Sequence, residues 1–148
     1  MVMIPAPAQA LLGTDAVAHV WTRNPDGSPQ VSVVWVIAHD DEILFGTDVN
    51  SRKAKNLRLD PHIILSIEDT ERNERGFQRH LVIRGTATIE PGDPEVFDRL
   101  AHQYTGIAHH PLVLRDSPTS VVVHVTIDRI SGVGPWVDES ETPPLQTT

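Results

Sequence analysis

The chain contains only two lysines, Lys53 and Lys55, and both lie in a segment with the pattern of a helix start. Ser51 is a favourable N-cap, and Asp60 followed by proline would end the helix. Basic residues oppose the dipole in the first turn of a helix, at about 0.3–1 kcal/mol each. Arg52 and Lys53 therefore suit this turn only if an anion binds there, because free N–H groups, the dipole and the cations would all favour a phosphate. The alternative is a solvent-exposed basic turn without a ligand.

Composition limits the classes of function. The chain has 148 residues, is 39% hydrophobic and 22% charged, and carries a formal net charge of −8. An acidic protein is poorly suited to nucleic acid or an anionic membrane as its main partner. With no cysteine, it can form neither disulfides nor thiolate-ligated metal sites, and its eight histidines show no ligand spacing, so we expect no metal site.

The N-terminal ten residues lack a basic segment and contain two prolines, which is unlike a signal peptide. No apolar run approaches the roughly 20 residues that span a bilayer. We therefore expect a cytoplasmic protein.

Hydrophobic periodicity predicts six strands, most of them joined by tight turns. Helices are predicted at 6–12, after Ser51, and from Pro94 to the residue before Gly106, while the charged segment 68–79 is predicted to be a long loop. Valines on both faces of 29–38 favour a central strand, and Gly85 suggests a bulge. The predicted strands are 16–23, 29–38, 42–47, 63–67, 81–89 and 120–130.

These elements predict a mainly β (α+β) protein with an antiparallel, six-stranded, closed or partly closed barrel and two or three short helices. Residues 1–137 would form a single domain, and the acidic, proline-containing segment 138–148 would be a disordered tail.

Three segments together resemble a known family: Asp-Gly-Ser-Pro-Gln-Val-Ser-Val-Val-Trp (26–35), Leu-Phe-Gly-Thr-Asp-Val-Asn-Ser-Arg-Lys (44–53) and His-Leu-Val-Ile-Arg-Gly-Thr-Ala (80–87). Their order and spacing are similar to those of the flavin/deazaflavin-binding split β-barrel proteins, the superfamily of pyridoxamine 5′-phosphate oxidase. Within it, the chain is most similar to the small actinobacterial-type enzymes that use coenzyme F-420. The resemblance covers about residues 16–130.

The resemblance implies a homodimer with two cofactor grooves at the subunit interface. The strand 30–35 would run along the flavin or deazaflavin ring, 46–47 would approach the ribityl chain, and the basic turn would hold the phosphate. His80 falls where the oxidase has a glutamine that contacts the ring, and Trp136 would come from the other subunit. The implied cofactor-binding residues are Gln30, Val31, Ser32, Val33, Val34, Trp35, Gly46, Thr47, Ser51, Arg52, Lys53, Lys55, Asn56, His80 and Trp136.

Two departures from the oxidase argue against oxidation of pyridoxamine phosphate. Gln30 stands where the oxidase has a phosphate-binding arginine, and Trp35 replaces a lysine. The C-terminal substrate motif with its arginine is also missing after Arg129. Lys55 suits the deazaflavin enzymes, whose cofactor has an acidic lactyl-oligoglutamate tail, and arginines in segment 68–79 could also meet that tail.

The implied reaction is hydride transfer from reduced deazaflavin to a conjugated organic substrate, with the cofactor providing the chemistry. Two alternatives remain open: an FMN-binding oxidoreductase of the same fold, and a non-catalytic carrier of a cofactor or haem. The sequence identifies no catalytic residue. A proton could come from His80, Tyr104, His109 or water, and Trp35 could equally pack in the core or stack on a ring.

Overall fold

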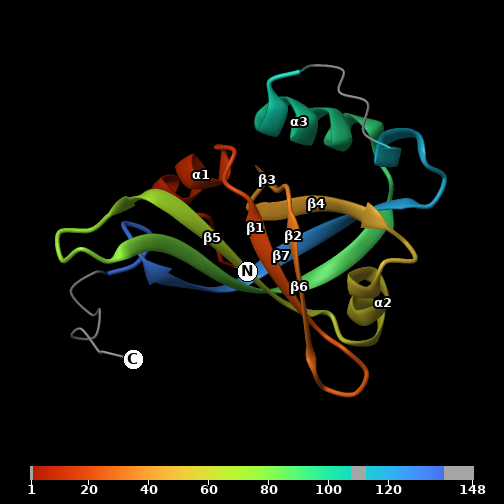
Figure 1. Ribbon diagram of the computed structural model, residues 1–148, viewed down its shortest axis with the longest axis horizontal. Helices are drawn as coiled ribbons and strands as arrows, with labels where there is room; N and C mark the ends of the chain where they lie inside the picture. The colour runs from red at the N-terminus through yellow and green to blue at the C-terminus, as the bar shows by residue number, and fades with distance from the viewer. Residues whose placement is uncertain (1, 108–112, 139–148) are drawn as a thin grey trace.

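The computed structural model describes residues 2–107 and 113–138, so the predicted tail lies almost wholly outside the described residues. In these two ranges, seven strands form one antiparallel sheet, accompanied by three α-helices and one 3-10 helix (Figure 1). No helix in these ranges is long and apolar enough to cross a membrane. The elements are α1 (Ala6–Leu12), β1 (Ala18–Arg23), β2 (Pro29–Val34), β3 (Ile37–His39), β4 (Glu42–Asp48), α2 (Arg52–Leu59), β5 (His62–Arg72), β6 (Gln78–Pro91), α3 (Pro94–Thr105), η1 (Val113–Asp116) and β7 (Ser120–Val133).

The strand order is β2-β1-β5-β6-β7-β4-β3, with β2 and β3 at the two edges. The mainly β, antiparallel fold with short helices is as predicted. The prediction of six strands was wrong, and within the described residues no pairing of β2 with β3 closes the sheet into a barrel. The sheet nevertheless encloses one core, because Val34 of β2 is buried in the same cluster as Phe45 of β4 and Ile83 of β6.

The predicted strand 29–38 is the main correction. It is interrupted after Val34, and its two parts, β2 and β3, lie at opposite edges of the sheet. Val31 and Val33 are 60% and 55% exposed, so the prediction of a central strand was wrong. A high valine content indicates a strand, but it does not distinguish a central strand from an edge strand that exposes valines on one face.

The charged segment 68–79 is a hairpin rather than the predicted loop. Strands β5 and β6 continue through it and pair Arg72 with Gln78 across a turn in which the Asn73 N–H donates to the Phe77 carbonyl at 2.9 Å. Arg79 and Glu71 form an ion pair at 2.8 Å. Residues of opposite charge on paired strands suit a solvated two-stranded ribbon, which hydrophobic periodicity does not detect.

Two glycine-dependent features occur as predicted. The β6–β7 register shifts between Arg84 and Gly85, where a Cβ would lie 2.6 Å from the Thr126 carbonyl oxygen. Helix α3 begins at the Asp93 cap and ends at Gly106, whose φ is 74°. α3 covers β3 and β4 through a second cluster that includes Ile37, Leu44, Phe97 and Leu100.

Candidate functional site

The start of α2 is fixed to the end of β4 by side-chain hydrogen bonds. Ser51 caps the helix as predicted: its Oγ accepts the Ala54 N–H at 3.2 Å. Thr47, buried at the end of β4, donates its hydroxyl to the same oxygen at 2.9 Å. The N–H groups of Arg52 and Lys53 belong to the first turn, where a helix supplies no carbonyls of its own to pair with them.

The rest of α2 is held against β1. Ala54 and Leu57 are buried on one face of the helix. Asn56 is fully buried, and its Nδ2 donates to Thr22 Oγ1 at 3.1 Å and Asn24 Oδ1 at 2.9 Å. Both amide hydrogens of Asn56 therefore bind the helix to β1 and to the turn that follows it.

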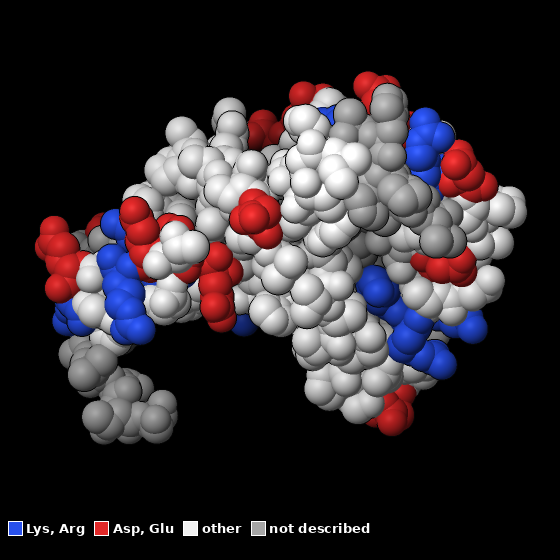
Figure 2. Space-filling model, turned by 45° about the horizontal axis from the view of Figure 1, so that its top comes forward, with Lys and Arg blue, Asp and Glu red and all other residues white. Residues whose placement is uncertain are grey.

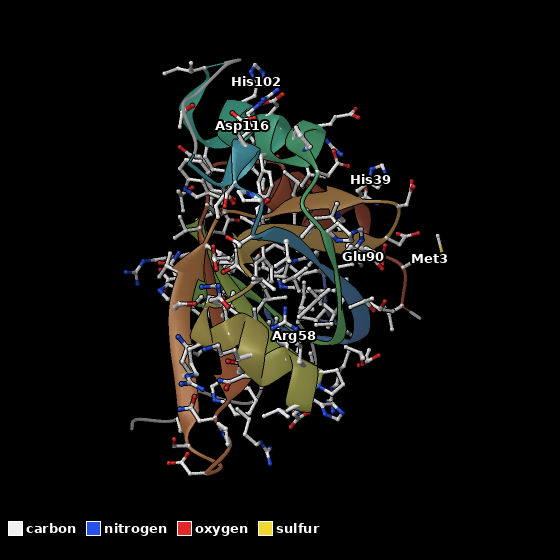
Figure 3. The ribbon with its side chains drawn as sticks, turned by 90° about the vertical axis from the view of Figure 1, so that its right-hand side faces the viewer. Met3, His39, Arg58, Glu90, His102 and Asp116 are labelled. Atoms are coloured by element: carbon white, nitrogen blue, oxygen red, sulfur yellow. The ribbon has the colours of Figure 1, made fainter. Side chains whose placement is uncertain are left out.

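A cavity of about 330 Å³ opens between α2 and α3, at the lower end of the size range of small-molecule sites. Figure 3 views this side of the molecule, with α3 (His102) above and α2 (Arg58) below. Strands β2 and β4 supply the wall between the helices. The residues lining the cavity are Val33, Val34, Trp35, Gly46, Thr47, Asp48, Lys53, Phe97, Leu100 and Leu114.

Lys53 is the basic residue of this cavity. Its side chain is half-buried among mainly apolar neighbours, and the loss of solvent lowers its pKa from the ordinary value of 10.5. Within the described chain, no carboxylate lies within 4.0 Å of its ammonium group. Asp48 also lines the cavity, but its carboxylate accepts the Asn50 N–H at 2.8 Å and the Thr119 hydroxyl at 2.6 Å.

Helix α2, on one side of the cavity, carries further positive charge. α2 has no acidic residue in its first turn and carries Arg52, Lys55 and Arg58, all exposed, in addition to Lys53. Figure 2 shows Lys and Arg side chains gathered beside a hollow in the surface. A half-buried ammonium without a carboxylate partner, at a helix N-terminus and beside an apolar cavity, is suited to an anionic group attached to an apolar body.

Six of the predicted cofactor-binding residues line the cavity: Val33, Val34, Trp35, Gly46, Thr47 and Lys53. Ser51 lies beside them as the α2 cap. Gln30 accepts a hydrogen bond from buried Thr22 at 3.2 Å, and the Ser32 Oγ is also buried, so both lie on the inner face of β2. Val31 points outward. Arg52 and Lys55 are exposed on α2, and Asn56 lies on the buried face of that helix, against β1.

His80 and Trp136 are not brought to the cavity of their own chain. The Trp136 indole N–H donates to the His80 carbonyl at 3.1 Å, and the indole is buried in the main core. His80 pairs with Val133 of β7, whereas Gly46 pairs with Val122, eleven residues earlier on that strand. At about 3.3 Å per residue, the two places are far apart along the sheet.

The sequence did not predict the α3 side of the cavity. Phe97 and Leu100 lie in the predicted helix from Pro94, but their place in the site depends on how α3 packs on β3 and β4. Leu114 gave no signal. Gly46 has a structural role as well, since a Cβ there would lie 2.1 Å from Phe97 Cε1.

The structure describes the surroundings of one candidate proton donor, Tyr104, but not those of His109. Tyr104 donates its hydroxyl to the Ala16 carbonyl at 2.7 Å and accepts the Val36 N–H at 3.0 Å, so the structure gives this hydroxyl two partners within the protein. His109 lies outside the described residues. Among the residues that are described, no group of three or more His, Asp or Glu side chains is arranged to hold a metal ion.

Known proteins resemble this chain in sequence and in fold. The family model described as pyridoxamine 5′-phosphate oxidase matches residues 4–134. No curated protein matches the sequence.

Several solved structures share the fold. A structure named F420 reductase is 27% identical, with a TM-score of 0.72, covering 86% of this chain and 98% of its own. The conserved hypothetical protein Rv2991 from Mycobacterium tuberculosis is 26% identical, with a TM-score of 0.74, covering 100% of this chain and 94% of its own. The haem storage protein HutZ from Vibrio cholerae shares the fold at 13% identity, with a TM-score of 0.68, covering 88% of this chain and 95% of its own.

Proposed function

Because this chain belongs to the pyridoxamine 5′-phosphate oxidase family, we propose that it is an oxidoreductase that uses coenzyme F-420 to reduce a conjugated organic substrate. The observation that carries the proposal is Lys53, a half-buried cation without a carboxylate partner among the described residues, at the mouth of an apolar cavity. The similarity to the structure named F420 reductase supports deazaflavin as the cofactor.

The residues around the cavity fit such a cofactor. Lys53 and the first-turn amides of α2 would hold the phosphate, with Arg52 at the rim. Gly46 and Thr47 would lie along the chain between phosphate and ring, and the β2 residues Val33–Trp35 would contact the ring. When bound, the reduced deazaflavin supplies the hydride. The protein binds and orients the cofactor and excludes water.

We propose that a second copy of the chain completes the site. The outer face of β2 exposes Val31 and Val33 beside the cavity, and Val33 also lines it. His80 and Trp136, which the family resemblance implies near the ring, lie far from the cavity of their own chain, so a homodimer would bring them to the partner's cavity. The Val31→Glu variant should sediment as a monomer while keeping its circular dichroism spectrum. A wild-type protein that sediments as a monomer at micromolar concentration would contradict the shared site.

The decisive experiment is a parallel titration with coenzyme F-420 and FMN. We expect coenzyme F-420 to bind at micromolar concentration or below, with quenching of its fluorescence, and FMN to bind much more weakly. Reduced coenzyme F-420 should then be oxidised, in the presence of the protein, by at least one member of a panel of quinones, enones and tetrapyrroles.

Two results would replace the proposal. A protein that is yellow as purified, with an FMN spectrum, would be an FMN-dependent member of the family. A protein that binds coenzyme F-420 without oxidation of the reduced cofactor by any panel member would be a carrier rather than a reductase.

A further inference from the structure

Trp35 lies where the chain leaves β2, and it is held by a second aromatic ring. The rings of Trp35 and Tyr104 stack with centroids 5.2 Å apart and an interplanar angle of 7°. Trp35 lines the cavity, and Tyr104 is not among the described residues that line it. Trp35 and Phe97 are thus the aromatic residues of the cavity lining, and Tyr104 stacks on Trp35 without lining the cavity itself.

The position of the tyrosine is itself fixed. Its hydroxyl donates to the Ala16 carbonyl and accepts the Val36 N–H, at 2.7 Å and 3.0 Å. The neighbouring Gln103 Nε2 lies 2.9 Å from the carbonyl oxygen of Val36 and from those of Leu12, the last residue of α1, and Thr14. The end of α3 thus holds both backbone polar groups of Val36, next to Trp35.

We propose that Tyr104 is a positioning residue that holds Trp35 as a stacking wall, and that the ligand group recognised by this wall is a flat conjugated ring. A preformed aromatic surface in a largely apolar cavity favours a planar π-system over a saturated group of the same size, because offset stacking adds to the gain from burial. A tryptophan already held by a second ring loses little side-chain freedom on binding. This inference rests on the proposed cofactor site and adds the residues that would select its ring.

The ring could belong to the cofactor or to the substrate, and two measurements distinguish these sources. If the wall stacks on the cofactor, Trp35→Leu and Tyr104→Leu should weaken coenzyme F-420 binding by about three- to tenfold. The residual fluorescence of coenzyme F-420 at saturating protein should also rise. If the wall stacks on the substrate, cofactor affinity stays unchanged, and the KM for a quinone acceptor rises while kcat is retained.

Tyr104→Phe separates this role from a purely structural one. Phenylalanine keeps the stacked ring but leaves the Val36 N–H without its acceptor, so we expect a lower melting temperature with wild-type affinity, KM and fluorescence at saturation. Tyr104→Leu should change the ligand measurements as well. If both variants lose stability and neither changes the ligand measurements, the inference is wrong.

Two outcomes distinguish a failure of this inference from a failure of the proposed function. Wild-type protein that binds neither coenzyme F-420 nor FMN overturns both. Wild-type binding that Lys53→Ala weakens, with no change in affinity, fluorescence or KM in Trp35→Leu and Tyr104→Leu, overturns the inference alone.

Discussion

Replacing Lys53 by alanine gives the most direct test of the phosphate site. The side chain is half-buried and lines the cavity, so the loss is that of a charge-assisted contact, about 1.5–3 kcal/mol, rather than that of an exposed ion pair. This corresponds to a dissociation constant about 10- to 150-fold higher. Titration of cofactor fluorescence with wild-type and variant protein measures the change directly.

The free energy of unfolding of the cofactor-free protein should not fall in Lys53→Ala. Lys53 opposes the dipole in the first turn of α2, and burial disfavours its charge. Its removal should therefore leave the free energy of unfolding of the cofactor-free protein unchanged, or raise it by up to about 1 kcal/mol. Urea denaturation of both proteins without cofactor measures this difference.

Lys55→Ala is the matched control, because it removes the same charge from the same helix at an exposed position. With FMN, which has no acidic tail, the control should lose less than about 1 kcal/mol of binding free energy. A folded Lys53→Ala variant with wild-type affinity would refute the phosphate assignment. Equal losses in both variants would show that only the overall charge of α2 matters.

Three further predictions test particular features of the site. Cofactor affinity should be constant at low pH and fall as pH rises through the lowered pKa of Lys53, below 10.5, because binding then requires proton uptake. Titrations across pH should show this fall, which Lys53→Arg should abolish. Gly46→Ala, which places a Cβ 2.1 Å from the Phe97 ring, should cost about 1–3 kcal/mol of unfolding free energy by urea denaturation, partly restored by Phe97→Leu. Asn56→Ala should lower the melting temperature in calorimetry, since it removes two hydrogen bonds to β1 and its turn, at about 1 kcal/mol each.

The local features that the sequence predicted are those formed by neighbouring residues. Ser51 caps α2 and accepts from Thr47 four positions earlier, so the basic turn follows from local geometry alone. The bulge at Gly85 and the helix from Pro94 to the residue before Gly106 were predictable for the same reason. Each depends on the conformational preference of one or two residues.

The predictions were wrong where the local structure depends on residues that are distant in the sequence. Val31 and Val33 have the composition of buried strand residues, yet they lie on an edge strand. The hairpin from Glu68 to Arg79 forms because β5 and β6 pair along it. Its polar composition gives no sign of this pairing. In both cases the residue types are compatible with two environments, and only the tertiary arrangement decides between them.

The candidate site therefore combines three regions of different origin. The phosphate end, from Thr47 to Lys53, is local; the ring end, formed by Trp35 and α3, requires the docking of α3 on β3 and β4; and the region around His80 would require a second copy. At the phosphate end, Lys53→Ala should change affinity with little effect on unfolding. Loss of the Tyr104 ring should lower both stability and ligand binding, because Tyr104 and Gln103 hold the strand break next to Trp35 and the ring stacks on the indole. A series of urea-unfolding and ligand-binding measurements would separate the two ends, since Tyr104→Leu should lose both stability and ligand binding, whereas Lys53→Ala should lose binding alone.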